Sequence, residues 1–262
     1  MVSSATTVDG ARSGATLKMS LGAQMDTTLR DIAKMIDHSL LHPRMTDDEL
    51  EHGCKVAAAY DVASVCIKPY AVPMAAQLLA GSDIKVGTVV GFPHGSSRIH
   101  IKVREAASAM IDGAEELDVV VNIGKVLSGD WDYVAEEIRE VNLVATEGGA
   151  TLKVIFENDF LSDDESKRRL CAVCSGLEVA FIKTSTGYGF VKQEDGRFAY
   201  RGAIDHDLAL MRRESAESVQ IKAAGGVRTL DDVLRVRALG VTRVGATATG
   251  AILAEAKERG YE

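Results

Sequence analysis

The stretch Val179-Ala-Phe-Ile-Lys183-Thr-Ser-Thr-Gly187-Tyr-Gly189 joins an apolar run to a lysine, and small hydroxyl residues and glycines follow. A short apolar run of this kind predicts a buried strand, and the glycines predict a turn after it. The same pattern recurs at Ser218-Val-Gln-Ile-Lys222-Ala-Ala-Gly225-Gly226. Two strands of one sheet are therefore expected to carry a lysine each to their carboxyl ends.

Working outward from these two stretches, strands and helices alternate along the chain. We expect strands at 36–41, 62–67, 84–92, 116–122, 151–157, 179–183, 218–222 and 241–245. We expect helices at 25–35, 46–60, 69–80, 97–112, 130–147, 162–175, 203–213, 229–239 and 247–259, with capping patterns at Thr46, Ser162 and Thr229. Such alternation predicts a parallel sheet with right-handed crossovers.

Eight strand–helix units in about 240 residues are typical of an α/β protein of the (β/α)8 TIM-barrel type. The alternative is a doubly wound open sheet, whose dinucleotide-binding form needs a G-x-G-x-x-G pattern that is missing after the first strand. The sequence predicts one barrel domain over 25–262, including the N-terminal helix. Residues 1–24 are rich in Ser, Thr, Gly and Ala and predict a short, flexible, loosely attached extension, with an organelle-targeting leader as the alternative.

Composition excludes several classes of partner. The 262 residues carry a formal net charge of −8, which disfavours nucleic acid and anionic membranes. No apolar run approaches the roughly 20 residues of a membrane span. The four cysteines fit a reducing compartment, and the Cys171/Cys174 pair lacks the further ligands that zinc needs. An anionic substrate would need a local positive pocket.

The two-residue period of strands places charged residues inside the predicted barrel. In 116–122, Leu117 and Val119 share the apolar face that should meet the helices, so Asp118 points inward. By the same reasoning Asp37, Lys153, Lys183 and Lys222 also point inward. Buried charges are costly unless they are paired, so this set is either a structural ion network or a functional group with shifted pKa values.

Two lysines and a buried carboxylate suit Schiff-base chemistry. A neutral Lys183 would attack an aldehyde, and the positive charge of Lys222 would keep Lys183 neutral. Asp118 would move protons, directly or through water. The alternative for each lysine is that it merely ends its strand in solvent.

Glycine-rich turns after the last two strands predict a phosphate site. Backbone amides in such turns, with a helix N-terminus behind them, bind anions. The residues expected there are Gly187, Gly225, Gly226, Val227, Arg228, Gly245, Ala246 and Thr247. Apart from Gly187, which follows the sixth strand, these residues lie at the ends of the seventh and eighth strands, the usual phosphate position in barrels.

Seven segments together resemble the deoxyribose-phosphate aldolase family. They are Ile36-Asp-His-Ser-Leu-Leu41, Val65-Cys-Ile-Lys-Pro69, Val86-Gly-Thr-Val-Val-Gly-Phe-Pro93, Glu116-Leu-Asp-Val-Val120, Leu152-Lys-Val-Ile155, Phe181-Ile-Lys-Thr-Ser-Thr-Gly187 and Ile221-Lys-Ala-Ala-Gly-Gly-Val-Arg-Thr229. The resemblance runs from about residue 30 to 255 in order and spacing.

The resemblance implies a class I aldolase, a lyase that needs no metal or other cofactor. It implies cleavage of 2-deoxy-D-ribose 5-phosphate to acetaldehyde and D-glyceraldehyde 3-phosphate, within carbohydrate and deoxyribonucleotide catabolism in the cytoplasm. It also implies a homo-oligomer, a dimer or larger. By position in the motifs, Lys183 corresponds to the Schiff-base lysine, Lys222 to the lysine that perturbs it, and Asp118 to the proton-relay aspartate.

Supporting residues follow from the same resemblance. Asp37 and Lys153 match a supporting polar pair, Cys66 matches a cysteine of the substrate pocket, and Thr186 matches a nearby hydroxyl. Tyr261 lies where the family can use a C-terminal tyrosine for proton transfer, but no motif anchors it.

Two departures from the family pattern leave alternatives open. The turn after the last strand reads Gly245-Ala-Thr-Ala248, so one expected hydroxyl is missing and phosphate binding should be weaker. The excursion 190–200 contains Asp195-Gly196, which predicts a hairpin that is either a lid or a decoration. Alternative functions are an aldolase with a changed, less phosphorylated acceptor and a barrel that only binds a phosphorylated ligand. The six histidines form no clear metal-ligand pattern, which disfavours a metal-dependent aldolase.

Overall fold

Eight parallel strands close into a barrel in the computed structural model, which describes residues 27–192 and 194–262. The strands are β1 (Ile36–Leu40), β2 (Ser64–Ile67), β3 (Lys85–Val90), β4 (Glu116–Val120), β5 (Thr151–Ile155), β6 (Phe181–Lys183), β9 (Gln220–Ala224) and β10 (Arg243–Ala246). Their order around the barrel is β1-β10-β9-β6-β5-β4-β3-β2, each paired in parallel with its neighbours. The predicted barrel is confirmed, and the open doubly wound sheet is excluded.

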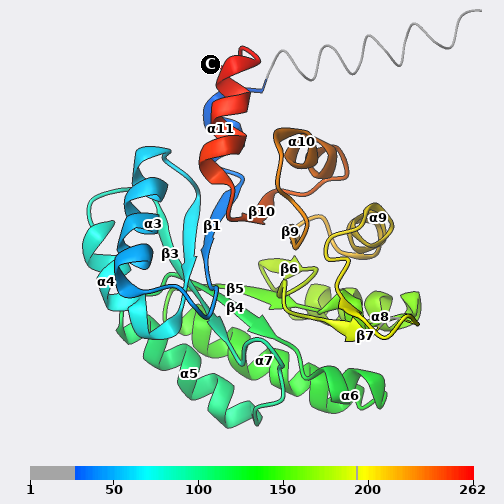
Figure 1. The fold of residues 1–262 in the computed structure, drawn as a ribbon. Helices are drawn as coiled ribbons and strands as arrows, with labels where there is room; N and C mark the ends of the chain where they lie inside the picture. Colours follow the sequence, from blue (N-terminus) through cyan, green and yellow to red (C-terminus); the bar gives the residue numbers. More distant parts are fainter. Residues whose placement is uncertain (1–26, 193) are drawn as a thin grey trace, which may run out of the picture.

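Helices form a ring outside the strands (Figure 1). They are α2 (Leu29–Ala33), α3 (Asp47–Ala59), α4 (Val72–Leu78), α5 (Ile99–Ile111), α6 (Ile123–Leu127), α7 (Trp131–Glu147), α8 (Asp164–Gly176), α9 (Asp205–Glu214), α10 (Leu230–Ala238) and α11 (Thr249–Glu258). Two 3₁₀ turns, η1 (Pro69–Ala71) and η2 (Asn158–Phe160), follow β2 and β5. The ring buries the outward faces of the strands, including Leu117, Val119 and Leu152.

Local capping explains where several helices begin. The capping boxes at Thr46 and Thr229 are confirmed, since each threonine and its N3 carboxylate exchange hydrogen bonds with the backbone. The capping box predicted at Ser162 is wrong by one residue, because Asp163 caps α8 and accepts from the Ser166 amide at 2.7 Å. Helix α6 was not predicted; Asn122 caps it and thereby ends the chain's run along β4.

The strand register sets charged residues side by side inside the barrel. Asp118 of β4 is paired with Lys153 of β5, and Lys183 of β6 is paired with Lys222 of β9. Because paired residues of parallel strands point to the same side of the sheet, both pairs face the barrel interior.

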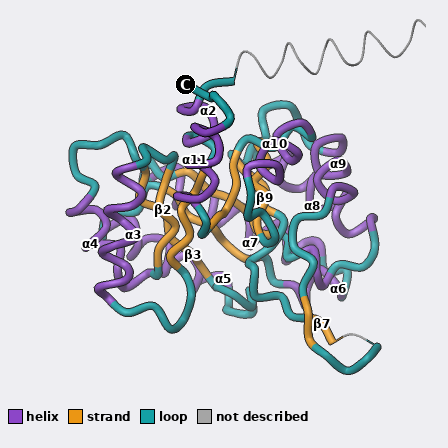
Figure 2. The backbone as a smooth tube through the Cα atoms, turned by 45° about the horizontal axis from the view of Figure 1, so that its top comes forward, coloured by secondary structure: helices purple, strands orange, loops and turns teal. Residues whose placement is uncertain are grey.

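The hairpin predicted within 190–200 is confirmed. Strands β7 (Val191–Lys192) and β8 (Phe198–Ala199) pair antiparallel, and Gly196 adopts a positive φ of 82° in the connecting turn. The hairpin lies between β6 and α9 in the chain, and Figure 2 shows it, labelled β7, projecting from the body of the barrel. Its base, however, is tied to the barrel, since the amides of Arg201 and Gly202 donate to the Asp159 carboxylate.

The chain end returns to the amino-terminal end of the barrel. Helix α11 runs back from β10, and the Leu29 amide of α2 donates to the Glu262 carbonyl at 3.1 Å. Tyr261 is buried there, at the end opposite the carboxyl ends of the strands. The predicted extension 1–24 and its alternative as a leader lie outside the described residues. Among the described residues, no helix is long and apolar enough to cross a membrane.

Candidate active site

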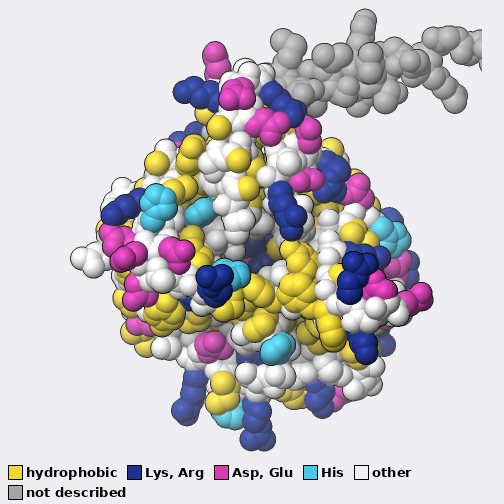
Figure 3. Space-filling view, viewed as in Figure 1, with side chains coloured by type: hydrophobic (Ala, Val, Ile, Leu, Met, Phe, Trp, Pro, Cys, Tyr) yellow, Lys and Arg dark blue, Asp and Glu magenta, His cyan; other side chains and the backbone are white. Residues whose placement is uncertain are grey.

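A cavity of about 600 Å³ opens at the carboxyl ends of the strands. It is bounded by the segments that follow β1, β6, β9 and β10, and Lys183, Lys222, Asp37 and Cys66 lie in its wall. Figure 3 shows the hollow near the centre of this face, with basic, histidine and hydrophobic side chains around it. This is the end where barrels hold their active sites, as the sequence predicted.

Lys183 and Lys222 meet at one carboxylate oxygen. Each Nζ lies 2.7 Å from Asp118 Oδ2. Asp118 is fully buried beneath the cavity and does not line it, so it reaches the cavity only through the side chains that contact it. Its other oxygen, Oδ1, accepts no hydrogen bond from any described residue and lies 3.6 Å from Lys153 Nζ.

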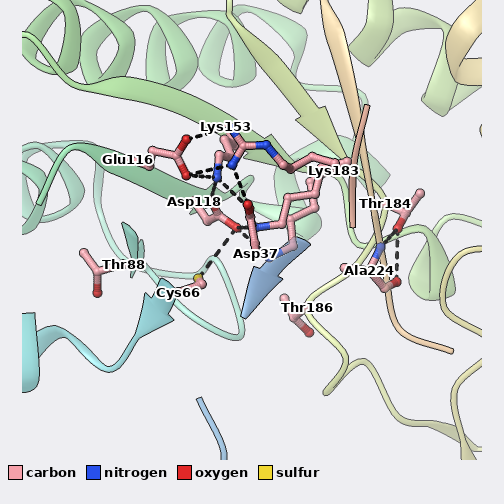
Figure 4. A network of polar contacts seen from close by, with 12 residues as sticks. Asp37, Cys66, Thr88, Glu116, Asp118, Lys153, Lys183, Thr184, Thr186 and Ala224 are labelled. Carbon is pink, nitrogen blue, oxygen red and sulfur yellow. Dashed lines mark hydrogen bonds and ion pairs between the residues drawn. The ribbon is translucent and has the colours of Figure 1, made fainter. Parts of the chain in front are cut away.

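A second layer of charge lies deeper in the barrel. Lys153 Nζ donates to Asp37 Oδ2 at 2.7 Å and also to Glu116. Arg243 donates to Asp37 Oδ1 at 2.5 Å and to Glu116 Oε1 at 3.1 Å. Lys222 joins the two layers, since its Nζ lies 2.5 Å from Asp37 Oδ2. Figure 4 shows Lys153, Lys183 and Cys66 gathered around the carboxylates of Asp37 and Asp118.

Mutual attraction fixes most of these groups in their charged forms. Burial opposes ionisation of Asp118, but Lys183, Lys222 and Lys153 outweigh it and lower the pKa of Asp118. Burial likewise opposes the charge on Lys222, but Asp118 and Asp37 outweigh it and raise the pKa of Lys222 well above its usual value. Lys222 is therefore favoured as a cation beside the amine of Lys183.

The cluster holds more positive groups than negative ones. Among the described residues, three carboxylates face four cationic side chains: Asp37, Glu116 and Asp118 against Lys153, Lys183, Lys222 and Arg243. Lys222 contacts two carboxylates of this set, and Lys183 contacts one. The charges balance when Lys183 is neutral.

Cys66 and Thr186 lie where they were expected, in the cavity wall. The Cys66 thiol is 3.9 Å from Asp118 Oδ2, and burial together with Asp118 raises its pKa to about 11. It is therefore a neutral thiol at physiological pH. The Thr186 hydroxyl donates to the buried Glu157 carboxylate.

The predicted phosphate turns also reach the cavity. Gly225 and Gly226 have φ values of +82° and +87°, which favour glycine, and they line it with Gly187, Val227, Arg228, Gly245 and Thr247. No described residue accepts a hydrogen bond from the amides of Gly226 and Val227, so these amides are available to an anion.

Three details differ from the sequence-based expectation. Ala246 is buried and does not line the cavity, and the Arg228 amide is engaged by Asp232 Oδ2 at 3.0 Å. Ala248 packs against the apolar core and does not line the cavity. A hydroxyl at this position would therefore not contact a ligand bound in the cavity. Tyr261 lies at the opposite end of the barrel and does not line the cavity.

Sequence reasoning missed several residues of the site. On β10, Arg243 shares a face with Gly245 and lies opposite to the buried Val244, so the two-residue period could have identified it. Arg44 belongs to a loop and carries no periodic signal, and Glu157 falls at the end of the expected strand 151–157, beyond the observed end of β5. Phe190 and Tyr200, at the base of the hairpin, line the cavity with ring centroids 5.3 Å apart, so the hairpin contributes a wall of the site.

One group outside the cavity has the composition of a metal site. Asp164, His206 and Asp207 bring their ligand atoms together between α8 and α9. A lysine occupies the position, however, since Lys167 Nζ lies 2.7 Å from Asp207 Oδ1 and 3.7 Å from Asp164 Oδ1. We interpret the group as a set of ion pairs between α8 and α9.

Similarity to known proteins matches this geometry. Residues 32–254 match the model of the DeoC/LacD family of aldolases. A deoxyribose-phosphate aldolase of Rhodopirellula baltica is 51% identical over 89% of this chain and 92% of its own length. One from Caldanaerobacter subterraneus subsp. tengcongensis is 42% identical over 90% of this chain and 97% of its own.

Solved structures agree. The aldolase QR15 superposes with a TM-score of 0.79 at 31% identity, covering 87% of this chain and 97% of QR15. The deoxyribose phosphate aldolase of Aeropyrum pernix, described as a unique tetramer, superposes with a TM-score of 0.78 at 25% identity, covering 88% and 93%. With a closed barrel, paired lysines on one aspartate and these matches, the chain belongs to the DeoC/LacD family of aldolases.

Proposed function

We propose that this aldolase cleaves 2-deoxy-D-ribose 5-phosphate to acetaldehyde and D-glyceraldehyde 3-phosphate through a Schiff base on Lys183. The single observation that carries the proposal is that Lys183 and Lys222 share Asp118 Oδ2 at the wall of the cavity. The names of the Rhodopirellula and Caldanaerobacter relatives support the substrate.

Lys183 is the nucleophile. Its neutral amine attacks C1 of the open-chain sugar, and loss of water leaves a protonated imine. The charge balance of the cluster supports this assignment, because a neutral Lys183 leaves three cations against three carboxylates. Lys222 holds its charge on Asp118 and Asp37 and so disfavours a second charge on Lys183.

Cleavage then breaks the C2–C3 bond. Its electron pair moves into the imine to form an enamine, and the proton of the C3 hydroxyl leaves to a base as C3 becomes the aldehyde of glyceraldehyde 3-phosphate. Protonation of the enamine at C2 and hydrolysis release acetaldehyde and restore the amine. Asp118 touches the reacting nitrogen and relays protons, a role that its contacts with both lysines support.

The other end of the substrate carries the phosphate. We assign its binding to the amides of Gly226 and Val227 and to the Thr247 hydroxyl, with Arg228 and Arg44 supplying positive charge at the rim. No ion pair within 27–192 or 194–262 engages either arginine. Both charges are therefore available to a dianion.

Further proposals concern cofactors, assembly and location. The protein works without metal, so a chelator leaves its activity unchanged. It forms a homo-oligomer, which exposed apolar side chains on α5 and α7 support (Ile101, Ile111 and Leu143). It works in the cytoplasm, which four free cysteines support.

Reductive trapping tests the proposed function. Acetaldehyde plus borohydride should leave an ethyl group on Lys183, found by peptide mass mapping, and 2-deoxyribose 5-phosphate should protect against it. An adduct on another lysine would refute the assignment of Lys183. A folded protein that gains no adduct and cleaves no substrate would favour the alternative of a non-catalytic barrel. Equal turnover of phosphorylated and unphosphorylated sugar would favour the alternative of a changed acceptor.

A further inference from the structure

Arg44 is a free cation in the wall of the active-site cavity, on the loop that follows β1. Its side chain is exposed and forms no ion pair or hydrogen bond with any described residue. A long side chain loses conformational freedom when it binds a ligand, so a fixed backbone lowers the cost of binding. The contacts that hold the backbone of Arg44 therefore bear on how well it binds an anion.

A tight turn fixes this backbone. The Met45 amide donates to the His42 carbonyl at 3.0 Å, which closes a β-turn with Pro43 and Arg44 at its centre. Proline suits the first central position of such a turn, because its φ is already near the required value. The Arg44 amide also donates to His42 Nδ1 at 3.3 Å. Arg44 thus occupies the second central position with its amide engaged.

Lys68, the residue after β2, holds the turn from outside the cavity. Its Nζ donates to the Met45 carbonyl at 2.8 Å and to the Pro43 carbonyl at 3.3 Å, the carbonyls on either side of Arg44 in the chain. Lys68 is half-buried and does not line the active-site cavity. Within the described residues no carboxylate forms an ion pair with it. Two of its three ammonium protons are therefore used on the backbone of the turn.

The turn lies on the side of the cavity that we assign to the phosphate. Strand β1 pairs with β10, and His42 and Thr247 follow these two strands. Both residues line the active-site cavity and also a neighbouring cavity of about 620 Å³. The loop after β1 and the turn after β10 therefore share their walls, and Arg44 borders the same cavity as Thr247.

A carboxylate near the turn leaves Arg44 free. Glu49 accepts from the Thr46 amide at 2.7 Å in the capping box of α3. The bonds from Thr46 lower the pKa of Glu49 most, and the charges of Arg44 and Lys68 contribute less. Glu49 forms no ion pair with either cation in the described part of the chain. The charge of Arg44 is therefore available to a ligand in the cavity.

We propose that Lys68 is a positioning residue that holds Arg44 at the phosphate end of the cavity and so sets the preference for phosphorylated over unphosphorylated substrates. The proposal rests on the proposed function and deepens it, because Lys68 acts only through the backbone of the turn. Without its ammonium, the carbonyls of Pro43 and Met45 bond to water and the turn is free to move. The guanidinium of Arg44 then samples more positions, and binding must fix them again.

Four variants separate positioning from charge and from general support of the loop. Arg44→Met removes the proposed phosphate contact, and Lys68→Met removes the contact that holds the turn. Lys68→Arg keeps the charge and the donors. Tyr70→Phe is the matched control, because the Tyr70 hydroxyl joins the same two segments by donating to Asp47 Oδ1 at 3.1 Å, but at α3 and not at the turn.

The measurement is kcat and KM for cleavage of 2-deoxyribose 5-phosphate and of 2-deoxyribose. Arg44→Met should raise KM for the phosphorylated sugar about tenfold, the value of one hydrogen bond to a charged group. Lys68→Met should cause part of that rise, about fivefold, and the double variant should not exceed Arg44→Met alone. In each variant kcat and KM for 2-deoxyribose should change less than about twofold. Lys68→Arg and Tyr70→Phe should keep the wild-type values.

Several results would overturn the proposal. Effects of Arg44→Met and Lys68→Met that multiply in the double variant would mean that Lys68 acts through its own charge. An equal rise of KM for both sugars, or a Lys68→Met protein that urea denaturation shows to be unfolded, would mean that Lys68 only supports the loop. A selective rise in Tyr70→Phe would point to a general disturbance of the two segments. Unchanged KM values in Lys68→Met would mean that Arg44 needs no support from it.

Calorimetric titration with inorganic phosphate tests Lys68 independently of turnover. The dissociation constant of phosphate should rise in Lys68→Met and Arg44→Met and stay at the wild-type value in Lys68→Arg. If the wild-type protein cleaves neither sugar, the proposed function fails, and this titration still decides the role of Lys68. A dissociation constant that is the same in the wild type and in Lys68→Met would refute that role.

Discussion

Two buried charged sites in this molecule behave in opposite ways. In the barrel, several cations and carboxylates share contacts, which raises the pKa of Lys222 and lowers that of Asp118. Outside it, Lys102 of α5 and Glu137 of α7 form a single ion pair of 2.7 Å, with both side chains almost fully buried. There, burial outweighs the pairing, so the pKa of Lys102 is lowered and that of Glu137 is raised.

The two sites differ in the number of charged partners of each group and in access to a cavity. The Lys102–Glu137 pair is complete, since Lys102 also donates to the Val120 carbonyl and Glu137 accepts from the Asn122 amide. The barrel cluster has one cation more than carboxylates, and two of its lysines border a cavity. Burial of charge by itself therefore does not distinguish the two sites, whereas unequal charge beside a cavity does.

The largest expected effect comes from removing the amine that borders the cavity. Lys183→Met should lower aldol turnover by several orders of magnitude, because the other lysine in the cavity wall, Lys222, is held as a cation and is a poor nucleophile. The free energy of unfolding should not fall, since Lys222 still pairs with Asp118. Coupled assays and urea denaturation measure the two quantities. Turnover near that of the wild type would refute the role of Lys183.

Breaking the Lys102–Glu137 ion pair should instead lower the stability of the fold and leave turnover unchanged. Lys102→Met leaves Glu137 buried without its cation and should lower the free energy of unfolding by about 3 kcal/mol. Turnover per folded molecule should stay near the wild-type value. Urea denaturation with active-site titration by borohydride trapping separates the two effects. Lost turnover in a variant of unchanged stability would mean that the pair also serves the active site.

A third substitution should shift the pH dependence of turnover without abolishing activity. Lys222→Leu removes the cation next to Lys183, so Asp118 and Asp37 favour protonated Lys183 up to a higher pH. The rising limb of the pH–rate profile should then move to higher pH. Lys222→Arg keeps the charge and should leave the limb in place. A limb that stays fixed in the leucine variant while turnover falls would indicate that Lys222 transfers protons instead.

The smallest expected effects concern two neighbouring residues of the turn after β10. One lies in the cavity wall and the other packs against the core. Thr247→Ala should raise KM for the 5-phosphate substrate about tenfold through the loss of one hydrogen bond, and should spare unphosphorylated deoxyribose. Ala248→Ser should change neither KM beyond about twofold, because Ala248 packs against the core. The sequence had suggested that this serine would improve phosphate binding. A selective fall in KM would place residue 248 at the phosphate after all.

The sequence by itself determined the barrel and the inward charges. Alternating units predicted eight parallel strands, and the two-residue period placed Asp118, Lys153 and Lys222 inside. These features are local, because strand periodicity and helix caps depend on neighbouring residues. Lys183 and Lys222 are register partners, because they hold equal positions on two strands that the barrel places side by side.

Only the tertiary structure decided where the loops place their side chains and which carboxylate each buried cation contacts. Glu157 reaches Thr186 because one left-handed residue redirects its side chain, and Arg44 reaches the cavity because β1 closes the barrel against β10. Ala248 and Tyr261 are turned away from the cavity by packing against the core. Such directions depend on contacts between segments far apart in the chain, and no periodic pattern encodes them.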